Sequence, residues 1–205
     1  MQNIPAFAEF LHVAALTNAE ILNYTNVSRE CGVSAKVVRN YFQILEDTLL
    51  GFRLEPWKKT RDRRLIETEK FYFFDVGVAN YLARRQPQFK TPEFGKAFEH
   101  FIAMELFAYQ AYKNPELKIT FWRTASGMEV DFILNDMEVA IEIKTSSRIS
   151  EADVRTLKIL QEENKVKKCI LVSFETEPRV LAKNIHCFPW EIFLKQLWDG
   201  EIISF

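Results

Sequence analysis

Residues 128–144 read MEVDFILNDMEVAIEIK, two apolar runs separated by a short polar stretch. In the second run, apolar side chains alternate with small or charged ones in the order Val139, Ala140, Ile141, Glu142, Ile143 and Lys144. Strict alternation of this kind is typical of a β-strand with one buried face. The polar residues Asn135 and Asp136 favour a tight turn between the runs. We therefore expect residues 128–144 to fold as an antiparallel hairpin.

The charged residues of this hairpin are expected to share one face. Alternation gives one face Val130 and Phe132 and the other face Glu129 and Asp131. A two-residue loop would pair Glu129 with Glu142 and put Asp131 one diagonal step away. A four-residue loop would instead put Asp131 directly opposite Glu142. Both registers bring two carboxylates close together, with Lys144 on the same face.

Two facing carboxylates repel each other unless a cation lies between them. Hard divalent cations take carboxylate and carbonyl oxygens, so Asp131, Glu142 and the carbonyl of Ile143 are candidate ligands for Mg²⁺, or alternatively for Mn²⁺. Lys144 would then position or help activate a water for attack on a phosphodiester, while the metal stabilises charge on the phosphate. The alternative is an ordinary half-exposed hairpin in which lysine and glutamate pair across the strands.

The rest of the second half alternates between helical and strand patterns. A helix is expected over 95–112, where Glu99 falls on or beside the apolar stripe and needs a partner, a cation or an exposed edge. Strands are expected at ITFWR (119–123) and KCILVSF (168–174), a helix from the capping box Ser150–Asp153 to about Glu163, and a last helix at WEIFLKQLW (190–198). Together with the hairpin, the order is α-β-β-β-α-β.

The first half contains a helix-turn-helix pattern. A short helix should end at Gly32, and Ser34 should cap a second helix whose apolar residues turn inward. The outer face of the second helix is polar and basic, with Lys36, Arg39, Asn40 and Gln43. Because the second helix of a helix-turn-helix enters the major groove of DNA, these four residues are candidate DNA contacts.

Two apolar runs around a basic loop follow the second helix and indicate a wing. The loop residues that can reach phosphates are Lys58, Lys59, Arg61, Arg63 and Arg64. Two alternatives stay open for this region. The loop could be a solvated hairpin tip, and the winged helix could bind a protein or form a homodimer instead of binding DNA.

Composition limits the partners and the location of the chain. Its 205 residues include 27 Lys and Arg against 28 Asp and Glu, a net charge of −1, so any attraction to nucleic acid must be local. The charge is +3 in residues 1–90 and −4 in residues 91–205, the two domains that we expect, with the stretch 84–94 as their linker. No run approaches the ~20 apolar residues of a membrane span, the N-terminus does not look like a signal peptide, and three scattered cysteines form no C-x-x-C pair. We expect a reduced, cytoplasmic protein without a membrane partner.

The spacing of Asp131 and Glu142-Ile-Lys144, on a hairpin that follows a helix with Glu99, resembles the PD-(D/E)XK nuclease fold. Four further stretches are similar to the uncharacterised C-terminal region of a large prokaryotic family of AAA+ ATPases: YFFDVGVANYL (72–82), GKAFEHFIAMEL (95–106), FWRTASGMEVDFIL (121–134) and AIEIKTSS (140–147). The resemblance extends over nearly the whole chain. Arg123 and Gly127 belong to the family pattern without a chemical role.

This resemblance implies metal binding by Asp131 and Glu142, the catalytic-lysine position for Lys144 and the first-helix acid for Glu99. Val130 stands where the motif has its proline. No Walker A motif is present, because the single Gly-Lys pair, at 95–96, is followed by alanine. We therefore expect either an ATPase partner or an N-terminal ATPase half outside this chain.

The leading hypothesis is an α+β nucleic-acid-binding protein in which a winged helix-turn-helix precedes a restriction-endonuclease-like, PD-(D/E)XK domain that cuts DNA with Mg²⁺. Its rival is a non-catalytic module that serves an AAA+ ATPase as a DNA-recognition or protein-interaction attachment. In that case the acidic cluster is a relic. A third hypothesis is a protein-binding or dimerising winged helix without a role on DNA.

Overall fold

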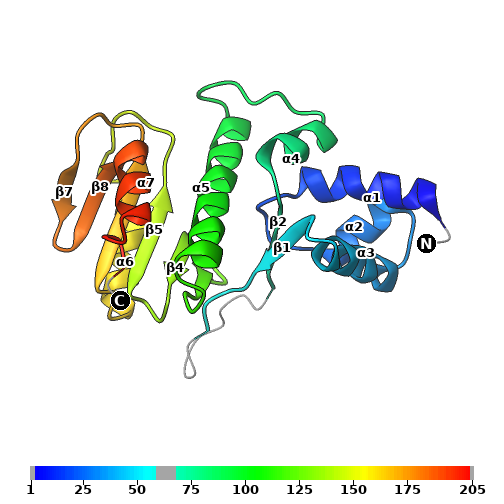
Figure 1. Cartoon of the computed structure of the whole chain (residues 1–205), viewed down its shortest axis with the longest axis horizontal. Helices are drawn as coiled ribbons and strands as arrows, with labels where there is room; N and C mark the ends of the chain where they lie inside the picture. The colour runs from blue at the N-terminus through cyan, green and yellow to red at the C-terminus, as the bar shows by residue number, and fades with distance from the viewer. Residues whose placement is uncertain (1–2, 59–67, 204–205) are drawn as a thin grey trace. The chain divides into compact units, whose positions relative to one another are not determined.

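The computed structural model describes residues 3–58 and 68–203, and the chain divides into two compact units (Figure 1). Unit 1 comprises Met1–Leu54 and Thr68–Phe101, and unit 2 comprises Glu55–Glu67 and Ile102–Phe205. One boundary falls inside helix α5 (Pro92–Tyr112), so the chain passes from one unit to the other three times.

Unit 1 begins with helices whose ends follow from the sequence. They are α1 (Ile4–Leu16), α2 (Tyr24–Cys31) and α3 (Ala35–Asp47), and α4 (Val76–Leu82) comes later in the chain. α2 ends at Gly32, whose φ of 63° is left-handed. At the start of α3, Val37 N donates to the Ser34 hydroxyl at 3.4 Å. The predicted boundary between these two helices is confirmed.

A two-stranded antiparallel sheet, β1 (Gly51–Leu54) and β2 (Lys70–Phe73), follows α3 and confirms two predicted strands. Its side chains join an aromatic core, in which Phe42 packs edge-on against Phe71 with ring centroids 4.9 Å apart. Gly51 is required at this contact, because a Cβ atom there would lie 2.2 Å from the Phe71 ring.

Unit 2 is built on a six-stranded sheet in the order β3-β4-β5-β6-β8-β7. The strands are β3 (Ile119–Arg123), β4 (Glu129–Leu134), β5 (Val139–Ile143), β6 (Lys168–Ser173), β7 (Arg179–Ala182) and β8 (Ile185–Pro189). β5, β6 and β8 run parallel, while β3–β4, β4–β5 and β7–β8 are antiparallel pairs. The protein is therefore a mixed α and β structure, and β7 and β8 are additions to the predicted order.

Helix α6 (Arg155–Glu163) packs on the sheet through Leu157 and Leu160, which share a hydrophobic cluster with Ala140, Cys169 and Leu171. The sequence predicts that this helix begins at the capping box Ser150–Asp153. Asp153 does accept hydrogen bonds from Ser150 N at 2.8 Å and Ser150 Oγ at 2.6 Å. Residues 151–154 nevertheless form turns, so the predicted start is wrong. The Ser150–Asp153 bonds close a separate turn before the helix.

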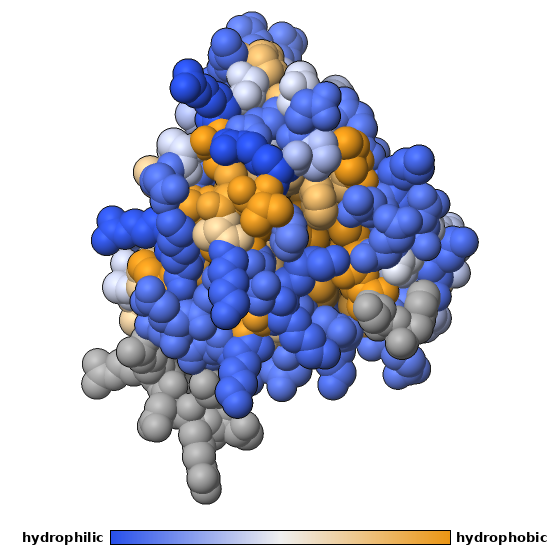
Figure 2. Space-filling view, turned by 90° about the vertical axis from the view of Figure 1, so that its left-hand side faces the viewer, coloured by the Kyte–Doolittle hydropathy of each residue, from blue (hydrophilic) through white to orange (hydrophobic). Residues whose placement is uncertain are grey.

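Helix α7 (Trp190–Trp198) lies against β6 and β8, as the last predicted helix, and confirms the prediction for 190–198. Its Trp198 contacts the second half of α5, where the ring lies 5.9 Å from that of Tyr109 and Nε1 donates to Glu105 at 2.8 Å. At the outer edge of the sheet, Val180 of β7 is 68% exposed. Figure 2 views this side and shows apolar side chains gathered inside a hydrophilic border.

A β-bulge interrupts β4 at the residues that carry the candidate chemistry. Thr120 and Trp122 of β3, two steps apart, pair with Ile133 and Val130 of β4, which are three steps apart. One extra residue therefore lies in β4 at positions 131–132. The bulge moves Val130 into the same hydrophobic cluster as Ile133, which strict alternation would place on the opposite face. The alternation expected for this strand is therefore wrong N-terminal to the bulge.

Candidate functional site

The β4–β5 hairpin brings Asp131 and Glu142 together by the longer of the two predicted loops. Leu134 pairs with Val139 across a four-residue turn, and one further pair is Phe132 with Ile141. Beyond this last pair, the charges of Asp131 and Glu142 both act on Lys144, so the two carboxylates lie in one cluster. Glu129, the partner of Glu142 in the shorter-loop alternative, is instead bound by Arg123 Nη1 at 2.6 Å.

Asp131 is half-buried and turned toward the neighbouring strand. Its Oδ2 accepts a hydrogen bond from Ile143 N at 2.7 Å. A carboxylate thus takes a backbone donor at the end of β5, next to the bulge. Bulges commonly re-aim a side chain in this way beside functional sites.

Glu142, near the end of β5, is 5% exposed and forms an ion pair with Lys144, the first residue after the strand. Its Oε1 lies 2.6 Å from Lys144 Nζ. Burial alone would lower the pKa of Lys144, but the charges of Glu142 and Asp131 outweigh burial and raise it. Lys144 is therefore a cation that lies among carboxylates, and the three predicted residues form one cluster in unit 2.

Asp153 is a fourth charged residue of this cluster, and no spacing rule in the sequence points to it. Burial raises its pKa, but the hydrogen bonds from Ser150 and the charge of Lys144 outweigh burial and lower it. The same mutual effect raises the pKa of Lys144. Lys144 and Asp153, the two ends of the segment 144–153, therefore lie close enough to interact electrostatically.

The described residues include no group of three or more His, Cys, Asp or Glu side chains that could hold a metal ion. Asp131 and Glu142 offer two carboxylates, and Mg²⁺ is commonly bound through one or two carboxylates while it keeps several waters. The donor chemistry of this pair therefore fits the predicted ion.

Glu99 takes part in a different cluster, within unit 1. Its Oε1 accepts hydrogen bonds from Lys70 Nζ at 3.1 Å and from Tyr72 Oη at 2.7 Å. Lys70 is 2% exposed and Tyr72 is fully buried. Glu99 thus has the partner that its position on the apolar stripe requires. Its assignment as the first-helix acid of the nuclease pattern stays a prediction.

The four residues predicted to contact DNA from α3 are all exposed, but two of them are held by neighbours. The Arg39 guanidinium lies 4.8 Å from the centre of the Tyr24 ring, and Gln43 Nε2 donates to Asp47 at 2.9 Å. Within the described part of the chain, the side chains of Lys36 and Asn40 form no hydrogen bond or ion pair. Unit 1 as a whole has nine basic and nine acidic side chains, so its surface has no general attraction for phosphates.

The described start of the basic loop, Glu55–Lys58, belongs to unit 2. Glu55–Glu67 has five basic and three acidic residues. Of the predicted phosphate contacts, Lys58 is exposed. The other four lie outside the described residues, and they are Lys59, Arg61, Arg63 and Arg64.

The described start of this loop pairs with β3. Trp57 N donates to Phe121 O, and Phe121 N donates to Glu55 O, at 2.6 and 3.1 Å. The Trp57 indole is buried, and its Nε1 donates to Asp136 at 3.0 Å. The sequence gives no signal for this contact, because its partners are far apart in the chain.

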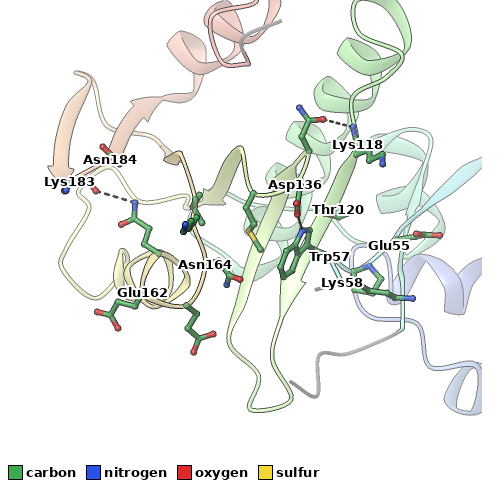
Figure 3. Close-up of a pocket in the computed structure, with 17 residues that line it drawn as sticks. Glu55, Trp57, Lys58, Lys118, Thr120, Asp136, Glu162, Asn164, Lys183 and Asn184 are labelled. Atoms are coloured by element: carbon green, nitrogen blue, oxygen red, sulfur yellow. Dashed lines mark hydrogen bonds between the residues drawn. The ribbon is translucent and has the colours of Figure 1, made fainter. Parts of the chain in front are cut away.

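A cavity of about 1250 Å³ lies in unit 2, at the end of the parallel strands opposite to the carboxylates. Residues that precede the parallel strands line it, such as Met137, Val166 and Asn184. Figure 3 shows the Trp57 indole directed at Asp136 along its wall. Its lining has four lysines and four acids, so the charge favours neither an anion nor a cation.

A pair that sequence reasoning missed ties the segment after β5 to the end of β6. Glu175 and Arg179 form a two-point ion pair, with Nε–Oε2 and Nη2–Oε1 distances of 2.7 and 2.8 Å. This pair holds the pKa of Glu175 at about 2, well below its ordinary value. The i, i+4 spacing of opposite charges was the available signal, but the residues do not lie on a helix.

Comparison with family models finds that each half of the chain is similar to a domain of unknown function. Residues 1–88 match the family described as domain of unknown function DUF8612, and residues 94–193 match domain of unknown function DUF4143. The family DUF4143 is known in AAA-ATPase-associated proteins. These two matches meet near the expected boundary at residue 90.

Two curated relatives also match part of the chain. They are the uncharacterized protein Rv2008c of Mycobacterium tuberculosis and the uncharacterized protein Mb2031c of Mycobacterium bovis, each 26% identical over 135 residues. The match covers 63% of this chain and 30% of each relative, so the chain spans about a third of their length. No solved structure matches the chain. Among the described residues, no helix is long and apolar enough to cross a membrane.

Proposed function

We propose that this chain is a cytoplasmic nucleic-acid-binding protein with a PD-(D/E)XK nuclease-like unit that hydrolyses DNA with Mg²⁺. The observation that carries the proposal is the meeting of Asp131, Glu142 and Lys144 at one end of the β4–β5 hairpin. Two carboxylates and a lysine in one half-buried cluster supply the charges that phosphodiester hydrolysis requires.

In this proposal, Asp131 and Glu142 would hold the metal, which would stabilise negative charge on the phosphate oxygens. Ile143 N holds Asp131 in place through a 2.7 Å hydrogen bond. Lys144 is a cation, so it stabilises charge at the phosphate and orients the attacking water. The water oxygen forms a bond to phosphorus, one P–O ester bond breaks, and the water protons pass to the leaving oxygen and to solvent.

For unit 1 we propose a winged helix-turn-helix that contacts DNA through α3. The left-handed Gly32 between α2 and α3, the cap at Ser34 and the hairpin β1–β2 support this assignment. Lys36 and Asn40 are exposed, and unlike Arg39 and Gln43 they are not held by a neighbouring side chain among the described residues. Arg39, which lies over an aromatic ring, has a restricted guanidinium that suits a phosphate.

The test of cleavage compares the full chain with Asp131→Ala and Lys144→Ala on single-stranded and double-stranded DNA, with Mg²⁺ or Mn²⁺. Matched controls are Glu162→Ala and Lys183→Ala, which remove one acid and one lysine that line the cavity at the opposite end of the strands. Loss of cleavage in the first two variants alone would support the proposal. Equal cleavage in all proteins would show a contaminating nuclease, and no cleavage by any of them would favour the second candidate below.

The second candidate is a non-catalytic DNA-recognition or protein-interaction module of an AAA+ ATPase. Three contacts favour it: Lys144 is bound to Glu142, and Glu99 is bound to Lys70 and Tyr72. The association of the second domain with AAA ATPases adds to it. Binding of DNA by the wild type that is unchanged in Asp131→Ala, without cleavage, would support this function.

A further inference from the structure

The segment from Lys144 to Ser150 lies beside the candidate carboxylates, at the carboxyl end of β5. Lys144 N donates to Val172 O at 2.9 Å, which keeps the start of the segment on the sheet. Ser147 and Arg148 are exposed, and Thr145 and Ser146 are half-buried. In open sheets with parallel strands, ligands bind outside the carboxyl ends of the strands.

The Glu175–Arg179 pair fixes the far side of this segment by binding both backbone groups of one residue. Ile149 N donates to Glu175 Oε1 at 2.7 Å, and Arg179 Nη2 donates to Ile149 O at 2.9 Å. The Ile149 side chain is itself buried in the cluster under α6. The side chains of Glu175 and Arg179 therefore make the hydrogen bonds to the backbone of Ile149 that a neighbouring strand would otherwise make.

Ser146 fixes the middle of the segment. Its carbonyl accepts from Phe174 N at 3.0 Å. Its hydroxyl donates to Arg148 O at 2.7 Å and accepts from Arg148 N at 3.1 Å. The backbone of Arg148 is thus held at both polar groups, while no described residue is seen to pair with its guanidinium.

A guanidinium on a fixed backbone, flanked by hydroxyls, has the donors that a phosphodiester accepts. Arginine presents a planar fork that matches phosphate oxygens, and serine and threonine hydroxyls commonly contact the nucleic-acid backbone. A fixed backbone also lowers the ordering cost of such a contact. Because the carboxylates beside the segment repel phosphate, a nearby cation is needed to bring the substrate close.

We propose that residues 144–150 form a phosphate-binding loop, in which Arg148, Thr145 and Ser147 contact the DNA backbone next to the Asp131–Glu142 pair. This inference rests on the proposed function and adds the residues that bind its substrate. Glu175 and Arg179 are positioning residues, because they act through the backbone of Ile149.

The test measures binding of the full chain to a fluorescent DNA duplex over a range of salt concentrations, without added metal so that no cleavage occurs. The variants are Arg148→Ala and the control Lys183→Ala. Lys183 is exposed beside the cavity at the opposite end of the strands, and its replacement removes the same charge. Loss of one phosphate contact should reduce the slope of log K against log salt by about 0.9. At 0.1 M salt this corresponds to roughly eightfold weaker binding. Lys183→Ala should change neither quantity.

A third variant, Glu175→Gln, tests the positioning role. It keeps every cation of the loop, so we expect weaker binding with an unchanged salt slope. Far-UV circular dichroism confirms that each variant is folded. If wild type binds DNA and Arg148→Ala binds equally well, or if both single-charge variants lose the same affinity, the loop is not the binding site and the proposed function stands. If wild type binds no DNA at any salt concentration, both proposals are overturned.

Discussion

Replacement of Glu99 by alanine should destabilise unit 1 strongly. The carboxylate accepts from Lys70 and Tyr72, and Lys70 is 2% exposed, so its removal takes the counter-ion from a buried ammonium. Breaking a buried ion pair in this way costs about 3–5 kcal/mol. For a chain of this size, each kcal/mol lowers Tm by roughly 2–4 °C, so the expected loss is roughly 6–20 °C.

The assay is urea and thermal unfolding followed by far-UV circular dichroism, with Glu93→Ala as the control. Glu93 is an exposed glutamate in the first turn of the same helix, and its replacement should change the free energy of unfolding by less than about 0.5 kcal/mol. The double variant Lys70→Met with Glu99→Leu removes both charges and should recover much of the stability. Equal stability of Glu99→Ala and Glu93→Ala would refute this reasoning and would free Glu99 for a role in chemistry.

Three further substitutions and one change of pH have effects on stability whose sign can be predicted. Gly95→Ala in α5 should stabilise the protein by about 0.5–1 kcal/mol, because the added methyl group meets nothing within 4 Å. Gly51→Ala should instead destabilise it by at least about 1–3 kcal/mol through overpacking. Urea unfolding measures both effects. Burial lowers the pKa of His100, so the unfolded chain binds a proton at this residue more readily than the folded chain does. The contribution of His100 to stability should be full above about pH 6.5 and should fall as the pH drops toward the lowered pKa. If the free energy of unfolding depends on pH in the same way in His100→Gln, other groups cause the dependence. Trp57→Phe keeps a ring but loses the indole hydrogen bond to a carboxylate, so unit 2 should lose about 1.5–3 kcal/mol in the same unfolding assay, and an unchanged midpoint would contradict the contact.

The local structure of this protein could be predicted where short-range chemistry decides it. Gly32 and Ser34 define the turn between α2 and α3, because a left-handed residue and a capping hydroxyl act within a few residues. The alternation of β5 predicted its strand and one of the two hairpin registers. Asp131, Glu142 and Lys144 lie beyond the last pair of that register, where Asp131 is held by a hydrogen bond from Ile143 N.

The remaining features depend on contacts between distant residues. The bulge in β4 arises from its pairing with β3, and it shifts Val130 to the other face without any mark in the local pattern. The partners of Glu99 lie almost 30 residues away in β2. The same is true of Glu175, whose role appears only once its carboxylate meets the backbone of Ile149.

The pairing of Glu55–Trp57 with β3 has a consequence for synthesis on the ribosome. Trp57 emerges from the ribosome about 60 residues before its partner Phe121 emerges. At roughly 5–20 residues per second, this gap lasts several seconds. During that time the nascent chain exposes an indole that the finished protein buries, and the second unit cannot complete its edge strand contact until β3 emerges. Codon changes that slow translation between residues 58 and 119 would therefore lengthen the period in which a chaperone can bind the nascent chain.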